Sequence, residues 1–438
     1  MIIDMPKDVN FIIERLEQAG YEAYAVGGCV RDSILKREPS DWDITTSARP
    51  EEIKALFRPT IDTGIQHGTV TVLRNHVGYE VTTYRIDGEY EDNRHPKDVV
   101  YTKSLTEDLK RRDFTINAMA YNASGLVDEF GGLDDIEKAV IRCVGDPKER
   151  FSEDALRMMR AVRFSAQLGY DIEEGTREAI KDLYGNLEAI SAERINVELT
   201  KMLISSHPEY IRDCYELGIT SVIMPELDEC MITEQNNPHH CYSVGEHIIR
   251  SMQGVEDDKV LRYAMLFHDI GKPRRKITDE KGIDHFYGHA ELSALMAHKI
   301  MKRLRFDNDT LYKVEKLVKY HDRKIEADGK SVRKAMNLIG RDLFPMLLKV
   351  KAADVSAQSD YKREQKEEEL RKIWDAYDKV ISDGDCVQIS DLAINGSDLI
   401  ARGMAPGPAI GEKLNYLLGK VIEEPSLNVK EKLLELLQ

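Results

Sequence analysis

The sequence has no long hydrophobic run. No segment approaches the roughly 20 consecutive apolar residues that a membrane-spanning helix needs. The N-terminal segment carries Asp4 and Asp8 and has the periodicity of an amphipathic helix that ends at Gly20, which is not typical of a signal peptide. We therefore expect a cytoplasmic protein that has no membrane partner.

Cysteines are few and scattered, and no two of them form a CxxC pair. Such spacing predicts reduced thiols in the core of a cytoplasmic protein and gives no sign of a disulfide framework. The six positions are Cys29, Cys143, Cys214, Cys230, Cys241 and Cys386.

Positive charge is in the minority, because 62 Lys and Arg face 78 Asp and Glu, a net charge of −16. A protein that binds nucleic acid wholesale is expected to be basic, so we expect no DNA partner. A local basic track is not excluded, because only the field near a bound backbone matters. Internal repeats and low-complexity tracts are also lacking.

Strand-like segments are confined to the first third of the chain. They are short and rich in β-branched and aromatic residues, which predicts strands over residues 22–26, 42–46, 69–73 and 79–84. From about residue 146 helical periodicity dominates, and the stretch from Ser152 to Gly169 is predicted as one helix with these residues as its N-cap and its stop. The pattern indicates an α+β head followed by an all-α remainder.

Two carboxylates, Asp41 and Asp43, flank Trp42 in the second predicted strand. Residues i and i+2 of a strand share a face, and paired carboxylates are the oxygen ligands that Mg²⁺ prefers beside phosphates. Gly28 upstream allows close approach of a phosphate, and Arg31 adds a cation. Glu80 on a later strand is a candidate third carboxylate. A DxD motif alone is common on surfaces, so the prediction depends on the combination.

The segments VGG, RD, DWDI and YEVTTYR together resemble the nucleotidyltransferase head of the DNA polymerase β superfamily. In detail they are similar to the class II tRNA nucleotidyltransferases and the related bacterial poly(A) polymerases. The resemblance implies a head with a mixed sheet, a Mg²⁺ site at Asp41 and Asp43, and a nucleotide-binding motif in RRDFTINAMAYN. In that motif Arg112, Asp113 and Asn117 are expected to contact the nucleotide; the alternative for Arg112 is a solvated helix start.

The stretch SEDALRMMRAVRF spaces one acid and three arginines at intervals of three residues. By spacing alone, Asp154 and Arg157 are best interpreted as an ion pair within one helix. The resemblance implies another role, because EDxxR is the motif with which this family reads the base of the incoming nucleotide. The expected nucleotide-binding residues here are Asp154, Arg157, Arg160 and Arg163, and SAERINVEL (191–199) resembles the motif that supports them.

Residues 84–102 are predicted to form a loop, because the segment is too polar and turn-rich for a strand. The segment resembles the flexible loop with which CCA-adding enzymes switch from C to A addition, and a mobile surface loop is compatible with that role. Its candidate residues are Arg85, Asp87, Tyr90, Asp92, Arg94 and Pro96.

A third group of residues consists of imidazoles and carboxylates, which suit Ni, Mn, Co, Fe or Zn. The order H…HD…D resembles the HD phosphohydrolase superfamily, and the four positions are His247, His268, Asp269 and Asp354. His289 and His321 are candidates for phosphate contacts or a second metal. The resemblance implies an HD domain, whether or not it is an active hydrolase.

These resemblances predict a tRNA nucleotidyltransferase that adds CCA from CTP and ATP with Mg²⁺ and without a nucleic-acid template. Three alternatives stay open: an A-adding enzyme or poly(A) polymerase, an HD phosphohydrolase with a degenerate head, and an RNA-binding module without activity. The expected regions are the nucleotidyltransferase head, a helical neck that binds RNA and the base, an HD-type domain and a helical tail, over 1–145, 146–240, 241–360 and 361–438.

Overall fold

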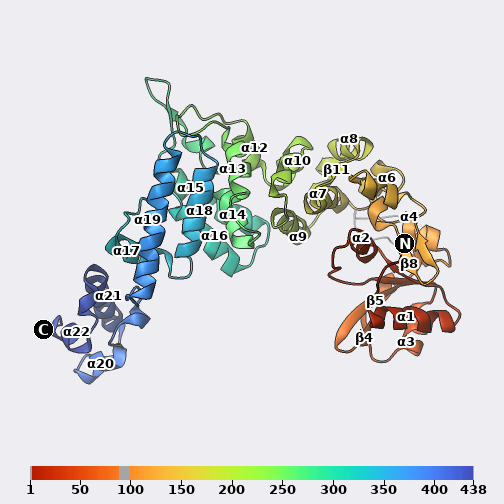
Figure 1. The fold of residues 1–438 in the computed structure, drawn as a ribbon, viewed down its shortest axis with the longest axis horizontal. Coiled ribbons are helices and arrows are strands. Elements are labelled where there is room, and N and C mark those ends of the chain that lie inside the picture. Colours follow the sequence, from red (N-terminus) through yellow and green to blue (C-terminus); the bar gives the residue numbers. More distant parts are fainter. Residues whose placement is uncertain (1, 88–98, 438) are drawn as a thin grey trace. The chain divides into compact units, whose positions relative to one another are not determined.

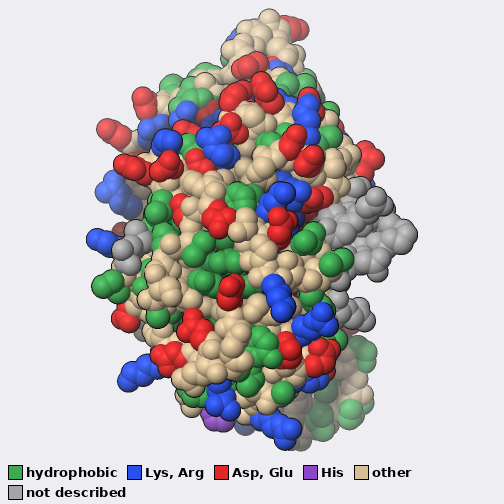
Figure 2. Space-filling model, turned by 90° about the vertical axis from the view of Figure 1, so that its right-hand side faces the viewer, with side chains coloured by type: hydrophobic (Ala, Val, Ile, Leu, Met, Phe, Trp, Pro, Cys, Tyr) green, Lys and Arg blue, Asp and Glu red, His purple; other side chains and the backbone are tan. Residues whose placement is uncertain are grey.

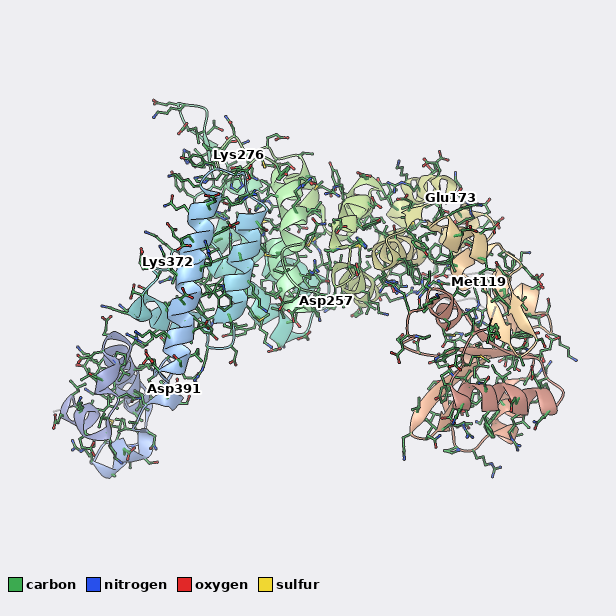
Figure 3. All side chains as sticks on the ribbon, viewed as in Figure 1. Met119, Glu173, Asp257, Lys276, Lys372 and Asp391 are labelled. Atoms are coloured by element: carbon green, nitrogen blue, oxygen red, sulfur yellow. The ribbon has the colours of Figure 1, made fainter. Side chains whose placement is uncertain are left out.

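The computed structural model describes residues 2–87 and 99–437 of the chain. They form two compact units, Met1–Ile223 and Met224–Gln438, which we describe separately. Figure 1 shows the elements of both units, and Figure 3 adds the side chains. The boundary between the units falls inside the predicted region 146–240.

A mixed seven-stranded sheet forms the centre of the N-terminal unit, in the order β3-β4-β5-β2-β1-β8-β9. Strands β2 and β5 are parallel, and the other neighbours are antiparallel. The strands are β1 (Ala23–Val26), β2 (Ile44–Thr46), β3 (Thr60–Gly64), β4 (Thr69–Arg74), β5 (Val77–Thr83), β8 (Ala120–Asn122) and β9 (Gly125–Val127). The predicted mixed α+β head is confirmed.

Helices α1 (Lys7–Gln18) and α3 (Pro50–Leu56) contribute one apolar side each to the core of the head. In α1 the buried residues recur at helical spacing, which predicts this packing from the sequence. Met119, labelled in Figure 3, is fully buried in the same core. The other helices of the head are α2 (Gly28–Ile34), α4 (Leu105–Lys110) and α5 (Gly132–Glu137).

The remainder of the N-terminal unit is helical apart from β10 (Val140–Ile141) and β11 (Asp171–Ile172), which pair in parallel. Its helices are α6 (Pro147–Glu153), α7 (Leu156–Leu168), α8 (Glu174–Leu183), α9 (Ala192–Leu203), α10 (Ile211–Glu216) and α11 (Ile219–Ile223). Helix α7 packs against α9, which brings the arginines of α7 next to the SAERINVEL segment.

The prediction of a single helix from Ser152 to Gly169 is wrong, because the chain leaves the helical conformation at Asp154. Asp154 has extended backbone angles, and its side chain accepts a hydrogen bond from the N–H of Leu156, the first residue of the new helix α7. Ser152 lies inside α6, where its hydroxyl donates to the carbonyl of Lys148. The predicted stop is confirmed: Gly169 ends α7 with a φ of 70°.

Two strand predictions also need correction. The strand predicted over 42–46 begins only at Ile44, so Asp41 and Asp43 lie in the segment that leads into β2. The segment 84–102, predicted as a loop throughout, contains strands β6 (Arg85–Asp87) and β7 (Val99–Tyr101), paired antiparallel. Backbone pairing, which polarity does not prevent, holds this stem together. Tyr90, Asp92, Arg94 and Pro96 lie outside the described residues.

The C-terminal unit is a helical assembly with one short hairpin, β12 (Ile277–Thr278) and β13 (Asp284–His285). Within the described ranges of the chain, no helix is long and apolar enough to cross a bilayer. The helices are α12 (Pro225–Met231), α13 (Val244–Met252), α14 (Lys259–Phe267), α15 (His289–Arg303), α16 (Asn308–Tyr320), α17 (Gly329–Ile339), α18 (Phe344–Ser356), α19 (Arg363–Ser382), α20 (Gly396–Ala401), α21 (Pro408–Glu423) and α22 (Lys430–Glu435).

Candidate active site and metal centre

Three carboxylates meet at one edge of the head sheet. The parallel pairing of β2 and β5 sets Ile44 opposite Val81, so the preceding residues Asp43 and Glu80 are neighbours in the register. The carbonyl of Asp43 accepts a hydrogen bond from the N–H of Val26 at 3.0 Å, which ties this segment to the end of β1. The side chains of Asp41, Asp43 and Glu80 are exposed, so a ligand can reach them.

Negative charge is in excess at this edge of the sheet, because three carboxylates lie there. Desolvation by the surrounding protein and the negative charge of Asp41 raise the pKa of the Asp43 carboxyl to about 6, Glu80 adds to the effect, and Arg112 opposes it. Carboxylates that repel one another in this way favour a bound cation. This donor set of carboxylate oxygens fits Mg²⁺.

The glycine turn places a guanidinium close to the carboxylates. Gly27 has a φ of 83°, and a Cβ atom there would lie 3.1 Å from Nη1 of Arg112. Gly28 begins α2, where a Cβ atom would lie 3.7 Å from Nη2 of Arg31. Both arginines therefore lie close to the backbone of this turn.

Asp108, which the sequence interpretation missed, is fully buried behind the arginines. Its carboxylate lies 2.7 Å from Arg111 Nη2 and 3.6 Å from Arg112 Nη2, and it accepts a hydrogen bond from the hydroxyl of Thr45 at 3.0 Å. It also accepts a hydrogen bond from the backbone N–H of Arg85 at 3.3 Å. The arginines hold its pKa below the usual value against the effect of burial. The sequence DLKRR could have predicted these contacts, because its acid lies three and four residues before the two arginines, the spacing of ion pairs on a helix.

A chain of polar contacts connects the glycine turn to helix α7. Arg31 Nη1 donates to Oδ1 of Asn117 at 2.6 Å, and the Asn117 amide donates to Asp113 at 3.2 Å. Asp113 in turn accepts from Arg160 Nε at 2.8 Å. Burial alone would raise the pKa of Asp113, but Arg160 and Arg157 lower it to about 2. The structure thus brings these four predicted residues together.

The phenyl ring of Phe164 lies within a group of three arginines. The guanidinium carbons of Arg31, Arg160 and Arg163 lie 5.1, 5.3 and 3.9 Å from the ring centroid. Arg163 forms an ion pair with Glu198 at 2.7 Å, and desolvation lowers the pKa of its guanidinium to about 10. Each of the three arginines also pairs with a carboxylate, Arg31 with Asp32, Arg160 with Asp113 and Arg163 with Glu198, so the guanidiniums are held in place by both the ring and the acids.

Asp154 and Arg157 each have a separate partner. Asp154 accepts hydrogen bonds from both terminal nitrogens of Arg194, at 2.7 and 3.2 Å. Arg157 pairs with Glu153 at 2.6 Å and donates to the carbonyl of Arg111 at 3.0 Å. Asp154 lies outside α7, so the interpretation as a pair within one helix is wrong. Arg194 was not singled out from the sequence, although it lies in SAERINVEL.

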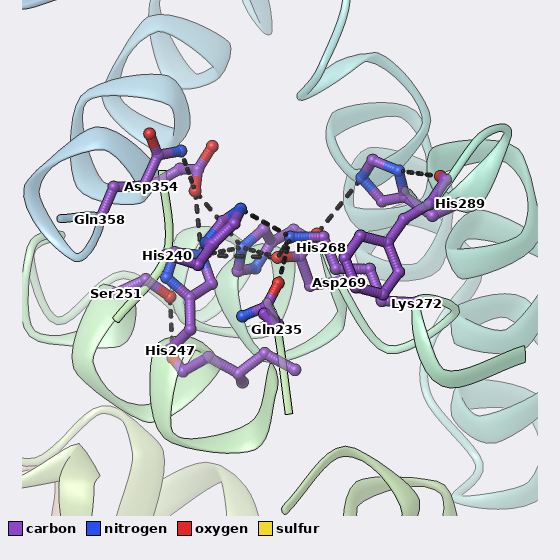
Figure 4. Close-up of polar contacts among 12 residues, drawn as sticks. Gln235, His240, His247, Ser251, His268, Asp269, Lys272, His289, Asp354 and Gln358 are labelled. Carbon is purple, nitrogen blue, oxygen red and sulfur yellow. Dashed lines mark hydrogen bonds and ion pairs between the residues drawn. The ribbon is translucent and has the colours of Figure 1, made fainter. Parts of the chain in front are cut away.

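The HD residues converge in the C-terminal unit (Figure 4). His247 Nε2 lies 3.2 Å from His268 Nε2, 3.0 Å from Asp354 Oδ1 and 3.4 Å from Asp269 Oδ2. All four predicted ligands therefore surround one point. His247, His268 and Asp269 are buried, and Asp354 keeps partial exposure.

Asp269 connects this group to a second one. Its other oxygen, Oδ1, lies 3.3 Å from His289 Nε2 and 3.6 Å from His321 Nε2. The two imidazoles approach each other to 3.3 Å. The structure thus contains two groups of three candidate ligands, His247–His268–Asp354 and Asp269–His289–His321, with Asp269 between them.

The four histidines are oriented in the same way. Each directs Nδ1 at a backbone carbonyl, which fixes the neutral tautomer with its lone pair on Nε2. The acceptors are the carbonyls of Ala357, Met265, Phe286 and Val318, at 3.3, 2.7, 2.9 and 2.7 Å from His247, His268, His289 and His321. Facing lone pairs repel one another unless a cation or proton lies between them, so the arrangement fits metal ions.

Three family models match most of the chain. Residues 23–142 match the Poly A polymerase head domain, and residues 169–231 match the probable RNA and SrmB-binding site of polymerase A. Residues 278–437 match tRNA nucleotidyltransferase domain 2.

Similar proteins carry the name CCA-adding enzyme. The one from Leuconostoc mesenteroides is 36% identical over 426 residues, 96% of this chain and 93% of the relative. The one from Lactiplantibacillus plantarum is also 36% identical, over 97% of this chain and 94% of the relative. The crystal structure of the Bacillus stearothermophilus CCA-adding enzyme in complex with CTP is 29% identical, covers 98% of this chain and 96% of that chain, and superposes with a TM-score of 0.73.

Proposed function

The chain belongs to the CCA-adding enzymes, which are tRNA nucleotidyltransferases, and from this we propose that its N-terminal unit joins C, C and A to the 3′ end of tRNA, taking them from CTP and ATP. The observation that carries the proposal is a single network in that unit. It runs from the glycine turn through Arg31, Asn117 and Asp113 to Arg160 on the helix that follows Asp154, and Arg112 lies between the same turn and the carboxylates at the sheet edge.

We assign the carboxylates to the metal and the arginines to the triphosphate. Asp41 and Asp43 would hold Mg²⁺, which would supply positive charge for attack of the tRNA hydroxyl on the α-phosphate, and Glu80 would be the third carboxylate of the site. Arg31 and Arg112 flank the glycine turn where phosphates approach. Gly28, Asp113, Asn117, Arg160 and Arg163 complete the nucleotide site.

Base selection belongs to Asp154 and Arg157. Cytosine and adenine both present an amino donor beside a ring-nitrogen acceptor, whereas uracil and guanine present the reverse. A carboxylate and a guanidinium that are held in place match the first pattern and leave the second unpaired. Arg194 and Glu153 fix these two side chains before the nucleotide binds.

Replacement of the carboxylates tests the metal assignment. Asp41→Ala and Asp43→Ala should each abolish nucleotide addition, because loss of the Mg²⁺ site removes several kcal/mol of transition-state stabilisation. Binding of tRNA, measured by filter retention, should persist in both variants. Asp62→Ala, which removes an exposed carboxylate on β3 that pairs with Lys54, is the matched control. Near-normal turnover in either site variant refutes the assignment.

We further propose that the C-terminal unit is a metal-dependent phosphohydrolase. Four Nε2 atoms with fixed tautomers and two carboxylates match the ligands of Ni, Mn, Co, Fe or Zn. Such a metal supplies a Lewis acid and a nucleophilic water to a phosphoester. Lys272, whose Nζ lies 2.7 Å from Asp269 Oδ2, holds that carboxylate and adds positive charge for the phosphate.

Metal content and hydrolysis test this second function together. After chelation and reloading with Mn²⁺, Ni²⁺ or Co²⁺, we expect stoichiometric metal and hydrolysis of p-nitrophenyl phosphate. His268→Ala should lose both and keep nucleotide addition, since the two sites lie in different units. His298→Ala, at a partly buried histidine of α15 that pairs with Glu315, is the control. Protein without bound metal and without hydrolysis contradicts the proposal.

We place the enzyme in the cytoplasm, where its substrate tRNA is made. This agrees with the six cysteines, which are all free thiols and five of which are buried.

On the face of the N-terminal unit that Figure 2 shows, acidic and basic side chains are interspersed. Of the arginines assigned above, Arg31 and Arg163 are buried, and Arg112, Arg157 and Arg160 are partly buried. We keep the regions 1–145, 146–240, 241–360 and 361–438 as proposed head, neck, HD domain and tail.

A further inference from the structure

Two cavities extend from the HD cluster in different directions. The larger, of about 480 Å³, reaches α19, and the smaller, of about 290 Å³, reaches the hairpin segment 284–289. Small-molecule sites typically measure about 300–1,000 Å³, so each cavity can take a substantial group. Six residues line both cavities: Asn237, His240, His321, Asp322, Asp354 and Gln358. Two of them, His321 and Asp354, belong to the cluster, so the two cavities meet beside it.

The two cavities have different walls. The smaller one has aromatic walls, because the rings of His285 and Tyr287 stack at 5.4 Å with an interplanar angle of 5°, and Phe286 lies beside them. Tyr287 is 71% exposed at this site. Lys272 Nζ, next to the cluster, lies 5.4 Å from the Phe286 ring centroid. An exposed aromatic surface beside a phosphate site is suited to stacking with a nucleobase.

The larger cavity combines cations with an aliphatic wall. Arg323, Lys324, Lys351 and Lys366 line it, against the three acids Asp322, Asp354 and Glu369, an excess of one positive charge. Lys366 Nζ lies 2.9 Å from His239 Nδ1, and the Lys366 ammonium also donates to Gln358, so the cation is held at the wall. This surplus of positive charge is suited to a second phosphate beyond the reacting one.

We propose that the HD centre acts on linear oligonucleotide phosphodiesters, with the reacting phosphate at the histidine cluster and a nucleoside in each cavity. One base stacks on the His285–Tyr287 pair, and the next phosphate meets Lys366. A phosphomonoester fills only one cavity and leaves the other to water. This inference rests on the phosphohydrolase function proposed above and specifies its substrate.

The reaction is a hydrolysis. For the 5′-phosphorylated dinucleotide pApA, a bond forms between phosphorus and a water oxygen, and the bond from phosphorus to the 3′ oxygen of the leaving nucleotide breaks. That oxygen takes up a proton, so one pApA and one water give two AMP. No oxidant or further reactant is needed.

Binding to the Mn²⁺-loaded protein provides a test that does not depend on turnover. Calorimetry with pApA that carries a non-hydrolysable methylene bridge should show roughly tenfold tighter binding than AMP. Tyr287→Ala and Lys366→Ala should each weaken dinucleotide binding roughly tenfold, and Tyr287→Phe should keep it. The matched controls are Tyr312→Ala on α16 and Lys372→Ala on α19 (Figure 3), both exposed and outside either cavity. Circular dichroism verifies that each variant is folded.

The outcomes separate the two proposals. AMP binding as tight as dinucleotide binding, or unchanged binding in both cavity variants, overturns this inference while hydrolysis of p-nitrophenyl phosphate upholds the phosphohydrolase. If the wild-type protein shows no metal-dependent hydrolysis of any phosphoester, both proposals are overturned. Cleavage of pApA and of the terminal nucleotide of a single-stranded RNA, compared side by side, shows whether the phosphodiester comes from a free dinucleotide or an RNA end.

Discussion

Asp154 gains its fixed position from a residue forty positions further along the chain. Arg194 binds both carboxylate oxygens, and the backbone N–H of Leu156 donates to one of them. In the proposed function, a carboxylate held in this way discriminates between bases because it cannot turn away from a mismatched partner. At the scale of single residues, we therefore expect the proposed base selection by Asp154 to depend on Arg194 as a positioning residue.

Arg194→Ala should release Asp154 and reduce discrimination between bases. Because charge-assisted hydrogen bonds contribute about 1.5–3 kcal/mol each, we expect kcat/KM for CTP and ATP to fall roughly tenfold or more, with a smaller change for UTP and GTP. Steady-state kinetics with all four nucleotides measures the ratio. Arg177→Ala removes a comparable ion pair with Asp213 and Glu216 and should leave the ratio unchanged. An unchanged ratio in Arg194→Ala contradicts this role.

At the scale of elements, a buried carboxylate connects the stem formed by β6 and β7 to the proposed nucleotide site. Asp108 on α4 contacts the backbone of Arg85 at the start of β6 and the side chains of Arg111 and Arg112. A displacement of the stem would therefore move Asp108 and, through it, Arg112, whose guanidinium lies beside the glycine turn. This contact gives the segment 84–102 a physical route to the site.

Replacement of residues 88–98 by a Gly/Ser linker of equal length tests this connection. The change keeps the stem strands β6 and β7 and removes the intervening side chains. We expect addition of the two C nucleotides to continue and addition of A to stop, because A requires the site to be readjusted for a larger base. Gel analysis of extended tRNA measures both steps. If the variant loses C and A addition equally, the segment has a general role in catalysis. If the variant adds A normally, the segment has no role in the change from C to A addition.

The sequence predicted much of the head but little of what depends on distant partners. Strands at 22–26, 69–73 and 79–84 followed from residue composition, and β1, β4 and β5 confirm them. The break at Asp154 was not predictable from periodicity, because the partner that stabilises it, Arg194, belongs to another helix. Likewise, motif order gave the HD positions, but the place of Asp269 between two groups depends on the packing of separate helices.

At the scale of the whole molecule, each unit contains its own centre with its own type of donor. The N-terminal unit presents carboxylate oxygens, and the C-terminal unit presents mainly imidazole nitrogens. Hard cations prefer the first set and transition metals the second, so the two chemistries can coexist in one chain. The net charge of −16 is compatible with tRNA as substrate, because only the field near the bound RNA backbone matters.

The order of nucleotide addition tests the central claim most directly. Three forms of one tRNA, lacking all three terminal nucleotides, ending in the first C and ending in both, are incubated separately with each nucleotide and Mg²⁺. We predict C on the first two, A on the third, and poor use of UTP and GTP throughout. Addition of A alone to every end, or of runs of A to any RNA, would contradict the account and indicate an A-adding enzyme or poly(A) polymerase.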